Sequence, residues 1–348
     1  MLRAGIERPV ARWQIAAWNH ERQNALTAGL GLPSLVAQLL LNRGIDTPDV
    51  AHHFLHATLA DIPSPFLMAD MDRAVDRILI ALKNRESIVI YGDYDLDGIS
   101  ASAILQAFLR HYQANVRYFM PDRQRDGYGL QQTALERLVA EGARLIVTCD
   151  NGTSAHDAIG WARAQGVDVI VTDHHSLPES LPAAIAVLNP MRRDCPESFR
   201  PLSGAGVAFM FAMALRKTLR DRLGGEGHPN LKRYLDLVTL GTVADVVPLT
   251  GVNRILVRYG LEELSHRGRP GLRALLEVSG VPKDERITTT TVGFRLGPRL
   301  NAAGRLEDAG HSVQLLLTPD PLEATRLAGH LNQLNRARQD LEAAILQE

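Results

Sequence analysis

The chain has 348 residues, a formal net charge of −1 at pH 7 and a hydrophobic content of 45%. Its length predicts one large or two moderate domains around a buried core. The sequence has no long apolar run and no apolar leader, so we expect neither a membrane span or membrane partner nor a secretory signal. Two cysteines, Cys149 and Cys195, argue against a disulfide scaffold and favour a cytoplasmic location.

Residues 1–70 are expected to form an N-terminal helical cap on the main domain. Residues 35–41 are an apolar helical stretch, and Thr47-Pro48-Asp49 has the pattern of a helix start. In that start Thr47 is the N-cap and Pro48 takes the first helical position. This part of the sequence carries no metal-type cluster and is therefore assigned a packing role.

The α/β core is expected to begin with an amphipathic helix over residues 71–83, followed by a strand over 87–91. Three carboxylates come next, Asp93, Asp95 and Asp97, and a helix over 99–112 follows. This order places the acids at the carboxyl end of a strand, where open α/β sheets bind their ligands. Carboxylates so close together repel one another, and they cannot all be ionised cheaply without a cation. The sequence therefore predicts a divalent-metal site.

Two further predicted strands end in the same way. Residues 145–149 run into Asp150, and residues 167–172 run into Asp173-His174-His175. Near-continuous apolar strands are typical of a parallel sheet buried on both faces, and helices are predicted over 131–141 and 156–165 to cover it. The fold class is therefore α/β, a mostly parallel sheet sandwiched by helices.

Other interpretations stay open for single residues of this group. Asp93 could cap the turn, and Asp150 could form an Asx turn or a helix N-cap. Adjacent side chains of an extended segment point in opposite directions. His174 is therefore expected to bind the metal, and His175 is expected to contact a phosphate at the site or to support the metal ligands.

Two features of the following segment bear on the same site. Gly204-Ala205-Gly206 precedes an apolar helix over 207–219, and close packing is favoured there over a phosphate cradle. A second helix, over 234–244, ends at Asp245. An acid at the negative end of a helix dipole is unfavourable unless it is neutralised, so Asp245 is a candidate for a further metal ligand.

The motif at residues 297–306, Gly-Pro-Arg-Leu-Asn-Ala-Ala-Gly-Arg-Leu, is expected to form a shaped loop that holds a phosphate through backbone amides and arginines. Residues 121–129 have the same character and follow a strand-like run over 116–120. Residues 251–305 carry ten basic and five acidic residues, which suggests a phosphate-binding surface. Structural turns and solvated arginines are the alternatives. An aromatic content of 5% argues against a prominent base-stacking platform.

A long helix is predicted at the end of the chain, with Asp320 as its N-cap and Pro321 in its first turn. Its apolar stripe consists of Leu327, Leu331, Leu334, Leu341 and Ile345. Residues 319–348 are therefore expected to be an interdomain helix that follows a catalytic domain at 71–318. The sequence is expected to be the N-terminal part of a longer protein.

Five motifs, taken in order, resemble those of the RecJ-like exonucleases in the DHH phosphoesterase superfamily, from about residue 35 onward. They lie at residues 91–98, 121–130, 149–152 with 173–175, 241–245 and 297–305. The resemblance implies a centre of two Mn²⁺ ions, with Mg²⁺ as the alternative. Asp95 and Asp97 would bind different ions, Asp150 would bridge them, and His174 and Asp245 would complete the second site. Many members have His where this chain has Tyr91, and Asp93 is expected to compensate.

The resemblance also implies a reaction. Two metals would hold a hydroxide for in-line attack on phosphorus, and His175 would contact the scissile phosphate. The expected substrate is single-stranded DNA, degraded from 5′ to 3′ into mononucleotides during DNA repair and recombination. The expected partners are a single-strand-binding protein and a helicase, and the expected state is a monomer. The residues expected to bind the DNA backbone are Arg123, Arg299, Asn301 and Arg305. The chain lacks the Gly-Gly-Gly-His motif of the DHH-associated domain, so weak substrate binding is expected.

Other classes explain the motifs less well. A haloacid-dehalogenase-type phosphatase would use Asp95 as a nucleophile, but it needs a lysine at a strand end and has no need for His174-His175. A non-catalytic nucleic-acid-binding protein of the DHH fold would not need the intact set of acids. A DHH phosphoesterase acting on short oligonucleotides is the rival within the class, and the cap and the Arg-rich stretch favour the exonuclease. A Rossmann dehydrogenase is excluded because no Gly-x-Gly-x-x-Gly follows the first strand.

Overall fold

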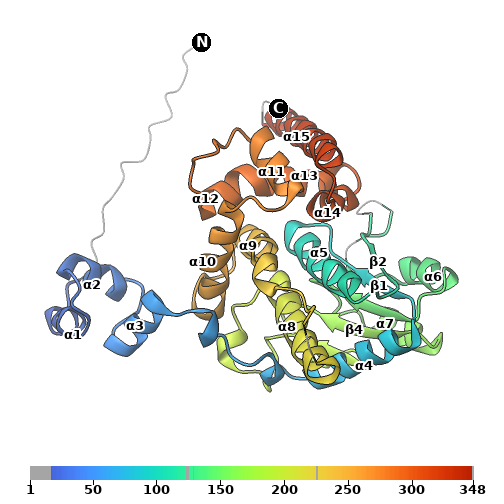
Figure 1. Cartoon of the computed structure of the whole chain (residues 1–348), viewed down its shortest axis with the longest axis horizontal. Helices are drawn as coiled ribbons and strands as arrows, with labels where there is room; N and C mark the ends of the chain where they lie inside the picture. The colour runs from blue at the N-terminus through green and yellow to red at the C-terminus, as the bar shows by residue number, and fades with distance from the viewer. Residues whose placement is uncertain (1–16, 123–124, 128, 225, 347–348) are drawn as a thin grey trace, which may run out of the picture. The chain divides into compact units, whose positions relative to one another are not determined.

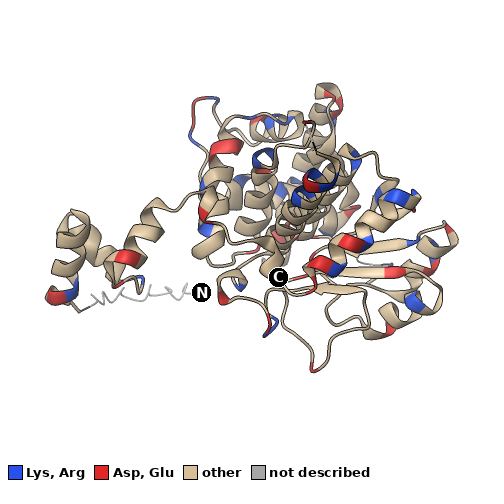
Figure 2. Cartoon of the chain, turned by 60° about the horizontal axis from the view of Figure 1, so that its bottom comes forward, with Lys and Arg blue, Asp and Glu red and all other residues tan. Residues whose placement is uncertain are grey.

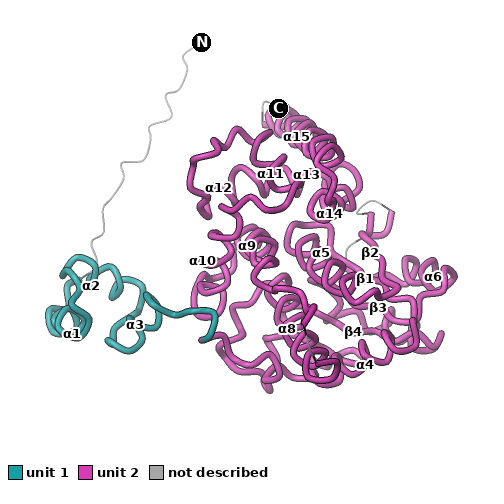
Figure 3. Tube along the Cα trace, in the orientation of Figure 1, with its two compact units in different colours: residues 1–60 teal, residues 61–348 magenta. Residues whose placement is uncertain are grey.

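The computed structural model describes residues 17–122, 125–127, 129–224 and 226–346. The chain divides into two compact units, Met1–Ala60 and Asp61–Glu348 (Figure 3). The described part of the first unit contains α1 (His20–Leu30), α2 (Ser34–Leu41) and α3 (Pro48–His56). Thr47 accepts a hydrogen bond from the Val50 N–H and caps α3, as predicted. The small core of this unit consists of Leu26, Ala37, Leu40, Ile45 and Ala51.

The second unit is built around one parallel sheet. Its strands are β1 (Ile88–Tyr91), β2 (Val116–Phe119), β3 (Leu145–Thr148), β4 (Asp168–Thr172) and β5 (Ala186–Leu188). They lie in the order β2-β1-β3-β4-β5, and every neighbouring pair is parallel. Figure 1 labels β1, β2 and β4 of this sheet and shows helices around it. The chain reverses its direction of travel across the sheet between β1 and β3. In open α/β sheets the crevice at such a switch point is where ligands bind.

Both faces of the sheet are covered by helices. On one face α6 (Gln132–Ala140) and α7 (His156–Ala164) bury Val89, Ile146 and Val169 of the strands. On the other face α4 (Met71–Asn84), α5 (Leu96–His111) and α8 (Gly204–Leu223) contact the strands. Strands β1 and β3 are buried in every position, whereas the edge strand β2 is half-buried and contains Arg117. The predicted α/β class is confirmed. The three-residue strand β5 was not predicted.

A helical part follows the sheet. It comprises α9 (Leu235–Ala244), α10 (Gly251–Ser265), α11 (Pro270–Val278), α12 (Thr289–Thr291), a π-helix (Val292–Leu296), α13 (Gly297–Leu306), α14 (Gly310–Leu317) and α15 (Pro321–Ile345). Short 3₁₀ turns occur at Leu59–Asp61, Pro65–Leu67, Glu197–Phe199 and Leu231–Tyr234. Helix α15 packs on α11, α13 and α14, and its N-cap is Asp320, as predicted. The expected domain limits at residues 70 and 318 stay predictions.

The loop predicted for residues 297–306 was wrong, because this segment is helix α13. The π-helix continues into α13 without a break, and Pro298 is the second residue of α13. Gly304 has a packing role, since a Cβ atom there would collide with the carbonyl of Tyr94. The glycines and proline that suggested a loop therefore lie within a helix, where Gly304 allows a close contact.

Among the described residues, no single helix is long and apolar enough to cross a membrane. The pair α1 and α2, bent by 119°, reaches the required length and composition only when its two helices are taken together.

Candidate metal centre

The acids after β1 take three different positions. Asp93 is buried at the strand end and accepts a 2.7 Å hydrogen bond from the Tyr94 N–H. Asp95 is the N-cap of α5, where it accepts hydrogen bonds from the N–H groups of Asp97 (3.0 Å) and Gly98 (3.1 Å). Because the N-terminus of a helix is its positive end, α5 favours negative charge at this position.

The Asp97 carboxylate is held by the N-terminus of a second helix, α8. It accepts hydrogen bonds from the N–H groups of Gly204 (2.5 Å) and Ala205 (2.9 Å). A Cβ atom at Gly204 would lie 2.7 Å from Asp150 Oδ1, and one at Gly241 in α9 would collide with Asp97 Oδ1. The glycines therefore allow close packing, the interpretation favoured by the sequence. The backbone amides at the start of α8 bind the Asp97 carboxylate.

Asp150 follows β3 in a left-handed conformation, with φ of 65°. This conformation is uncommon for a residue with a side chain, although Asp and Asn adopt it more readily than others. The surrounding turn holds it in place. The Asp150 N–H donates to the Thr172 carbonyl (2.9 Å), and the Thr148 hydroxyl donates to the Asn151 carbonyl (2.6 Å). Asp150 is not a helix N-cap, since α7 begins six residues later.

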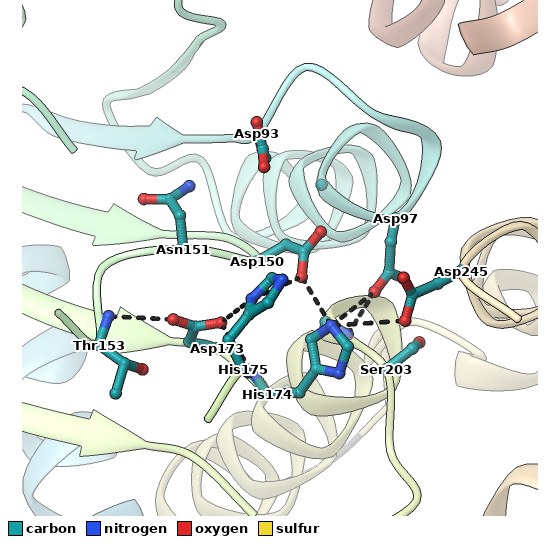
Figure 4. Close-up of polar contacts among 12 residues, drawn as sticks. Asp93, Asp97, Asp150, Asn151, Thr153, Asp173, His174, His175, Ser203 and Asp245 are labelled. Atoms are coloured by element: carbon teal, nitrogen blue, oxygen red, sulfur yellow. Dashed lines mark hydrogen bonds and ion pairs between the residues drawn. The ribbon is translucent and has the colours of Figure 1, made fainter. Parts of the chain in front are cut away.

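The ring of His174 lies among three carboxylates (Figure 4). Its Nε2 is 3.1 Å from Asp150 Oδ1, 3.5 Å from Asp245 Oδ2 and 3.7 Å from Asp97 Oδ2. Among the described residues, neither Nε2 of His174 nor Oδ1 of Asp150 has a hydrogen-bond partner, although both atoms are buried. Buried polar atoms are almost always satisfied. Two unsatisfied ligand atoms that face each other fit residues arranged around a cation.

His175 faces the same centre and is oriented by Asp173. Its Nδ1 is 2.8 Å from Asp173 Oδ1 and 3.9 Å from Asp150 Oδ1. Asp173 is buried and also accepts hydrogen bonds from the N–H groups of Thr153, His174 and His175. Asn189 on the next strand end donates to the carbonyl of His175 (3.0 Å). The supporting roles of Asp173, Thr153 and Asn189 were not predicted, although Asp173 stands in the motif itself.

Burial dominates the electrostatics of the carboxylates. Burial and the charge of Asp95 raise the pKa of Asp93 to about 7, and burial and Asp245 raise the pKa of Asp97 to about 8. The pKa of Asp150 lies well above its usual value, because it is buried beside Asp97 and Asp95. Burial and Asp95 raise the pKa of Asp245 to about 6. The accumulated negative charge is unfavourable without a cation.

The two histidines differ in charge. Burial lowers the pKa of His174 to about 4, so its ring is neutral and its nitrogen can bind a metal. The hydrogen bond to Asp173, against the effect of burial, raises the pKa of His175 to about 9. Burial opposes ionisation of Asp173, but the hydrogen bond and charge of His175 hold its pKa at about 2. Asp173 and His175 therefore form an ion pair at neutral pH.

The ligand atoms fall into two main groups. One group contains Asp93, Asp95 and Asp150, and the other contains Asp97, His174 and Asp245; the ligand atoms within each group lie within 4.8 Å of one another. Asp150 also groups with His174 and His175. Carboxylate oxygens with one imidazole suit divalent ions such as Mn²⁺. The residues present therefore fit a metal centre with Asp150 between its two halves.

Asp245 is the C-cap of α9, and the backbone is strained immediately after it. Val246 has φ of 61°, rare for a β-branched residue, and the residue is 85% exposed. Beside it lies a cavity of about 490 Å³ whose lining includes Phe294, Asn301 and Arg305. Phe294 is 80% exposed, and Asn301 Oδ1 is buried without a hydrogen-bond partner among the described residues. Phe294 was not predicted, and its only signal in the sequence was its place just before the arginine motif.

The remaining residues singled out from the sequence do not all lie at the centre. Arg299 donates to Asn332 (2.9 Å) and to the Arg295 carbonyl (2.6 Å), and so links α13 to α15. Arg123 lies outside the described residues. Tyr91 is buried in the core, and its hydroxyl is 3.1 Å from the Gly129 carbonyl. Tyr91 is thus not among the residues that surround the centre.

Some arginines of the basic stretch at 251–305 form ion pairs with acidic residues of the same chain. Arg269 pairs with Asp236 (2.5 Å), and Arg295 pairs with Glu285 (3.3 Å). Arg254, Arg258 and Arg286 line a separate cavity of about 670 Å³. Figure 2 shows basic and acidic residues interspersed on the helices. A phosphate-binding surface on this stretch stays a prediction.

Comparison with known proteins agrees with this architecture. Residues 87–242, from β1 to α9, match the family described as DHH family, N-terminal domain. The chain is 40% identical to the single-stranded-DNA-specific exonuclease RecJ of Bacillus subtilis, over 97% of this chain and 41% of that protein. It is 41% identical to RecJ of Escherichia coli, over 90% of this chain and 55% of that protein. The chain thus spans about half the length of these curated relatives.

Solved structures give the same result. A crystal structure of exonuclease RecJ bound to manganese is 37% identical, with a TM-score of 0.73, and the match covers 83% of this chain and 70% of the other. RecJ from Thermus thermophilus in complex with Mn²⁺ is 34% identical, with a TM-score of 0.80, over 96% of this chain and 46% of the other. The chain belongs to the RecJ family of DHH proteins.

Proposed function

We propose that this chain carries the catalytic part of a metal-dependent exonuclease that degrades single-stranded DNA from 5′ to 3′ into mononucleotides. The observation that carries the proposal is the pair His174 Nε2 and Asp150 Oδ1, 3.1 Å apart, buried and without a hydrogen-bond partner among the described residues. The names of the relatives, single-stranded-DNA-specific exonucleases, support the substrate. Structures of relatives with Mn²⁺ and with Mg²⁺ support the class of cation.

The proposed ligand sets follow the two groups of side chains. Asp93, Asp95 and Asp150 would hold one ion, and Asp97, His174 and Asp245 would hold the other, with Asp150 shared. Because one ligand is an imidazole, Mn²⁺ is favoured over Mg²⁺, which prefers oxygen ligands. When bound, two such ions neutralise a phosphodiester and lower the pKa of water for in-line attack on phosphorus.

The protein's own groups would act on the phosphate around the ions. His175 carries a positive charge at neutral pH, because the Asp173 carboxylate binds its Nδ1. Nε2, the other ring nitrogen, then carries a proton that it can donate to a phosphate oxygen as charge develops there. Asp173 is a positioning residue in this scheme, since it acts through His175.

The cavity beside Asp245 is the proposed path of the DNA strand. Arg305 would pair with a backbone phosphate, and the unpartnered Oδ1 of Asn301 would accept a hydrogen bond from the strand. The exposed ring of Phe294 would stack on a base, a sequence-tolerant contact suited to single strands. Arg299 is proposed to hold α13 in place as well as to contribute positive charge. Arg123 stays a predicted contact.

Several further properties are proposed on the resemblance and composition alone. These are a role in DNA repair and recombination, a single-strand-binding protein and a helicase as partners, a monomeric state and a cytoplasmic location. A phosphoesterase acting on short oligonucleotides differs from the proposed exonuclease in substrate length, and the following assay separates the two.

The test is the degradation of single-stranded oligonucleotides of five and forty nucleotides with Mn²⁺, beside a blunt duplex. A 5′ label released at once as a mononucleotide, with a 3′-labelled strand shortening gradually, establishes the polarity. An Asp150→Asn variant is the control, and Mn²⁺ binding is measured calorimetrically in every sample. Release from the long strand that the variant abolishes supports the exonuclease, and release from the short strand alone supports the rival. Mn²⁺ binding without cleavage of any strand, or no Mn²⁺ binding, would overturn the proposal.

A further inference from the structure

Outside the strand-end centre, three potential metal ligands from three elements meet at one point. Glu307 follows the last residue of α13, His311 lies in the first turn of α14, and His330 lies in α15. The Nε2 of His330 is 2.8 Å from Oε2 of Glu307, and the Nδ1 of His311 is 3.9 Å from the same oxygen. All three ligand atoms lie within 4.8 Å of one another.

A simple hydrogen-bonded pair does not account for this arrangement. The bond between His330 and Glu307 satisfies one nitrogen and one oxygen. The Nδ1 of His311 is buried and has no hydrogen-bond partner among the described residues, although it is aimed at the same carboxylate. The two rings meet edge to face, with centroids 5.1 Å apart. A buried nitrogen lone pair left unused beside a carboxylate and a second imidazole requires an explanation.

We propose that Glu307, His311 and His330 form a second metal site, for a transition-metal ion of the Zn²⁺ class. Two imidazole nitrogens and one carboxylate oxygen are a common ligand set for Zn²⁺ and a poor one for Mg²⁺ or Ca²⁺. Tetrahedral ligands at Zn²⁺ bond lengths are roughly 3.3 Å apart. The observed separations of 2.8 and 3.9 Å bracket that value, so small side-chain rotations complete the site.

The exposure of the ligands indicates how the ion would be held. The side chains of Glu307, His311 and His330 are 43%, 35% and 31% exposed. The fourth position of the ion would therefore face solvent and would be open to a water molecule. Such a site exchanges its ion more readily than a closed site with four protein ligands. None of its ligands belongs to the strand-end centre, so its occupancy does not depend on the proposed nuclease activity.

An ion here would fasten the end of α13 and the first turn of α14 to the body of α15. Helix α13 carries Asn301 and Arg305 of the cavity beside Asp245, and Glu307 lies directly after it. Bound to α14 and α15 through the ion, the end of α13 loses freedom to move. The role assigned is thus structural, in the part of the protein that lines the proposed DNA path.

The test compares Zn²⁺ binding by the whole chain with binding by an H311Q/H330Q double variant. A matched control is His266→Gln, because His266 lies 3.7 Å from Glu263 but has no third ligand in the clusters found among the described residues. Equilibrium dialysis with metal analysis should give one Zn²⁺ fewer for the double variant, and an unchanged number for the control. Tetrahedral Co²⁺ gives visible absorption bands, and one set of these bands should disappear in the double variant.

Thermal unfolding supplies a second measurement. Zn²⁺ should raise the melting temperature of the wild type more than that of the double variant. If the double variant does not fold, Glu307→Gln decides the question, because it removes one charge from a half-exposed position. Equal Zn²⁺ stoichiometry and equal Co²⁺ spectra in wild type and a folded variant would overturn the proposal.

Discussion

Asp173 and His175 form a 2.8 Å hydrogen bond between Oδ1 and Nδ1, two residues apart in the chain. The same carboxylate accepts the backbone N–H groups of His174 and His175 and so fixes the turn that carries both rings. The first residue of the Asp-His-His triplet therefore orients the other two. One buried acid sets the geometry of a proposed ligand and the charge of a proposed phosphate contact.

An Asp173→Asn variant should no longer hold the ring of His175 in its charged form. The pKa of His175, about 9 with Asp173 ionised, should fall toward the ordinary value of about 6.5. NMR titration of the histidine ring protons measures this shift directly. Cleavage at pH 8 should fall by roughly 10- to 100-fold, as is usual when a partner of a metal-site histidine is removed. An unchanged His175 pKa would show that Asp173 does not determine its charge.

Asp150 and Asp245 should differ in their effects on metal stoichiometry. Asp150 belongs to the group with Asp93 and Asp95 and also lies 3.1 Å from His174 of the other group, whereas Asp245 belongs to the second group alone. Asp150→Asn should weaken binding of both Mn²⁺ ions, and Asp245→Asn should weaken only one. Asparagine suits the left-handed backbone of Asp150, so the fold should be preserved. Calorimetric titration with Mn²⁺ distinguishes the two patterns, and identical stoichiometries in the two variants would contradict the shared position of Asp150.

The metal-free protein should become less stable as the pH rises from about 4 to about 8. Asp93 and Asp97 have raised pKa values of about 7 and about 8, whereas both titrate near 3.8 when unfolded. Between these values the folded chain binds more protons, so its free energy of unfolding falls with rising pH. Saturating Mn²⁺ should remove most of this decline, since the ions replace the protons. Thermal melts from pH 5 to pH 9, with chelator or with Mn²⁺, measure both effects; parallel curves would contradict the explanation.

Gly241→Ala should damage the centre more than the fold. The added methyl group would collide with Asp97 Oδ1 and approach the Ala205 methyl within 2.7 Å. Displacement of Asp97 should lower cleavage by at least tenfold, with a loss of about 1–3 kcal/mol in stability. Gly160→Ala, in α7 with open space around it, is the control and should be neutral or stabilising by up to about 1 kcal/mol. Denaturant unfolding and oligonucleotide cleavage are the two measurements.

Phe294→Ala should weaken DNA binding without affecting Mn²⁺. Loss of one stacked base costs about 1–3 kcal/mol, which is roughly 5- to 150-fold in affinity for single strands. Leu322→Ala is a suitable control, because Leu322 is 82% exposed in α15 and does not line this cavity. Fluorescence anisotropy with a labelled oligonucleotide in the presence of Ca²⁺ measures affinity without cleavage. Equal affinities in wild type and both variants would exclude Phe294 from the DNA path.

The strand ends were predictable because the carboxyl ends of parallel strands meet at one edge of a sheet. Asp93, Asp150 and His174 could therefore be brought together from the apolar runs that precede them. The helix at 297–306 could not be predicted, because glycine and proline are typical of loops. Here they lie in a helix that continues from a π-helix and makes a close contact. The left-handed backbone of Asp150 and the position of Phe294 depend on tertiary packing, which local sequence patterns do not encode.

The proposed ligands follow β1, β3, β4 and α9 or lie at the start of α5, and therefore join segments that are about 150 residues apart in the chain, from Asp93 to Asp245. Bound ions would hold the two ends of this long loop together in the folded state, and their binding free energy would add to the free energy of unfolding. The last turn of α9 stands to gain most, since the backbone leaves it through the strained Val246. Amide hydrogen exchange in that turn should therefore slow when Mn²⁺ binds, while exchange in the central strands changes little.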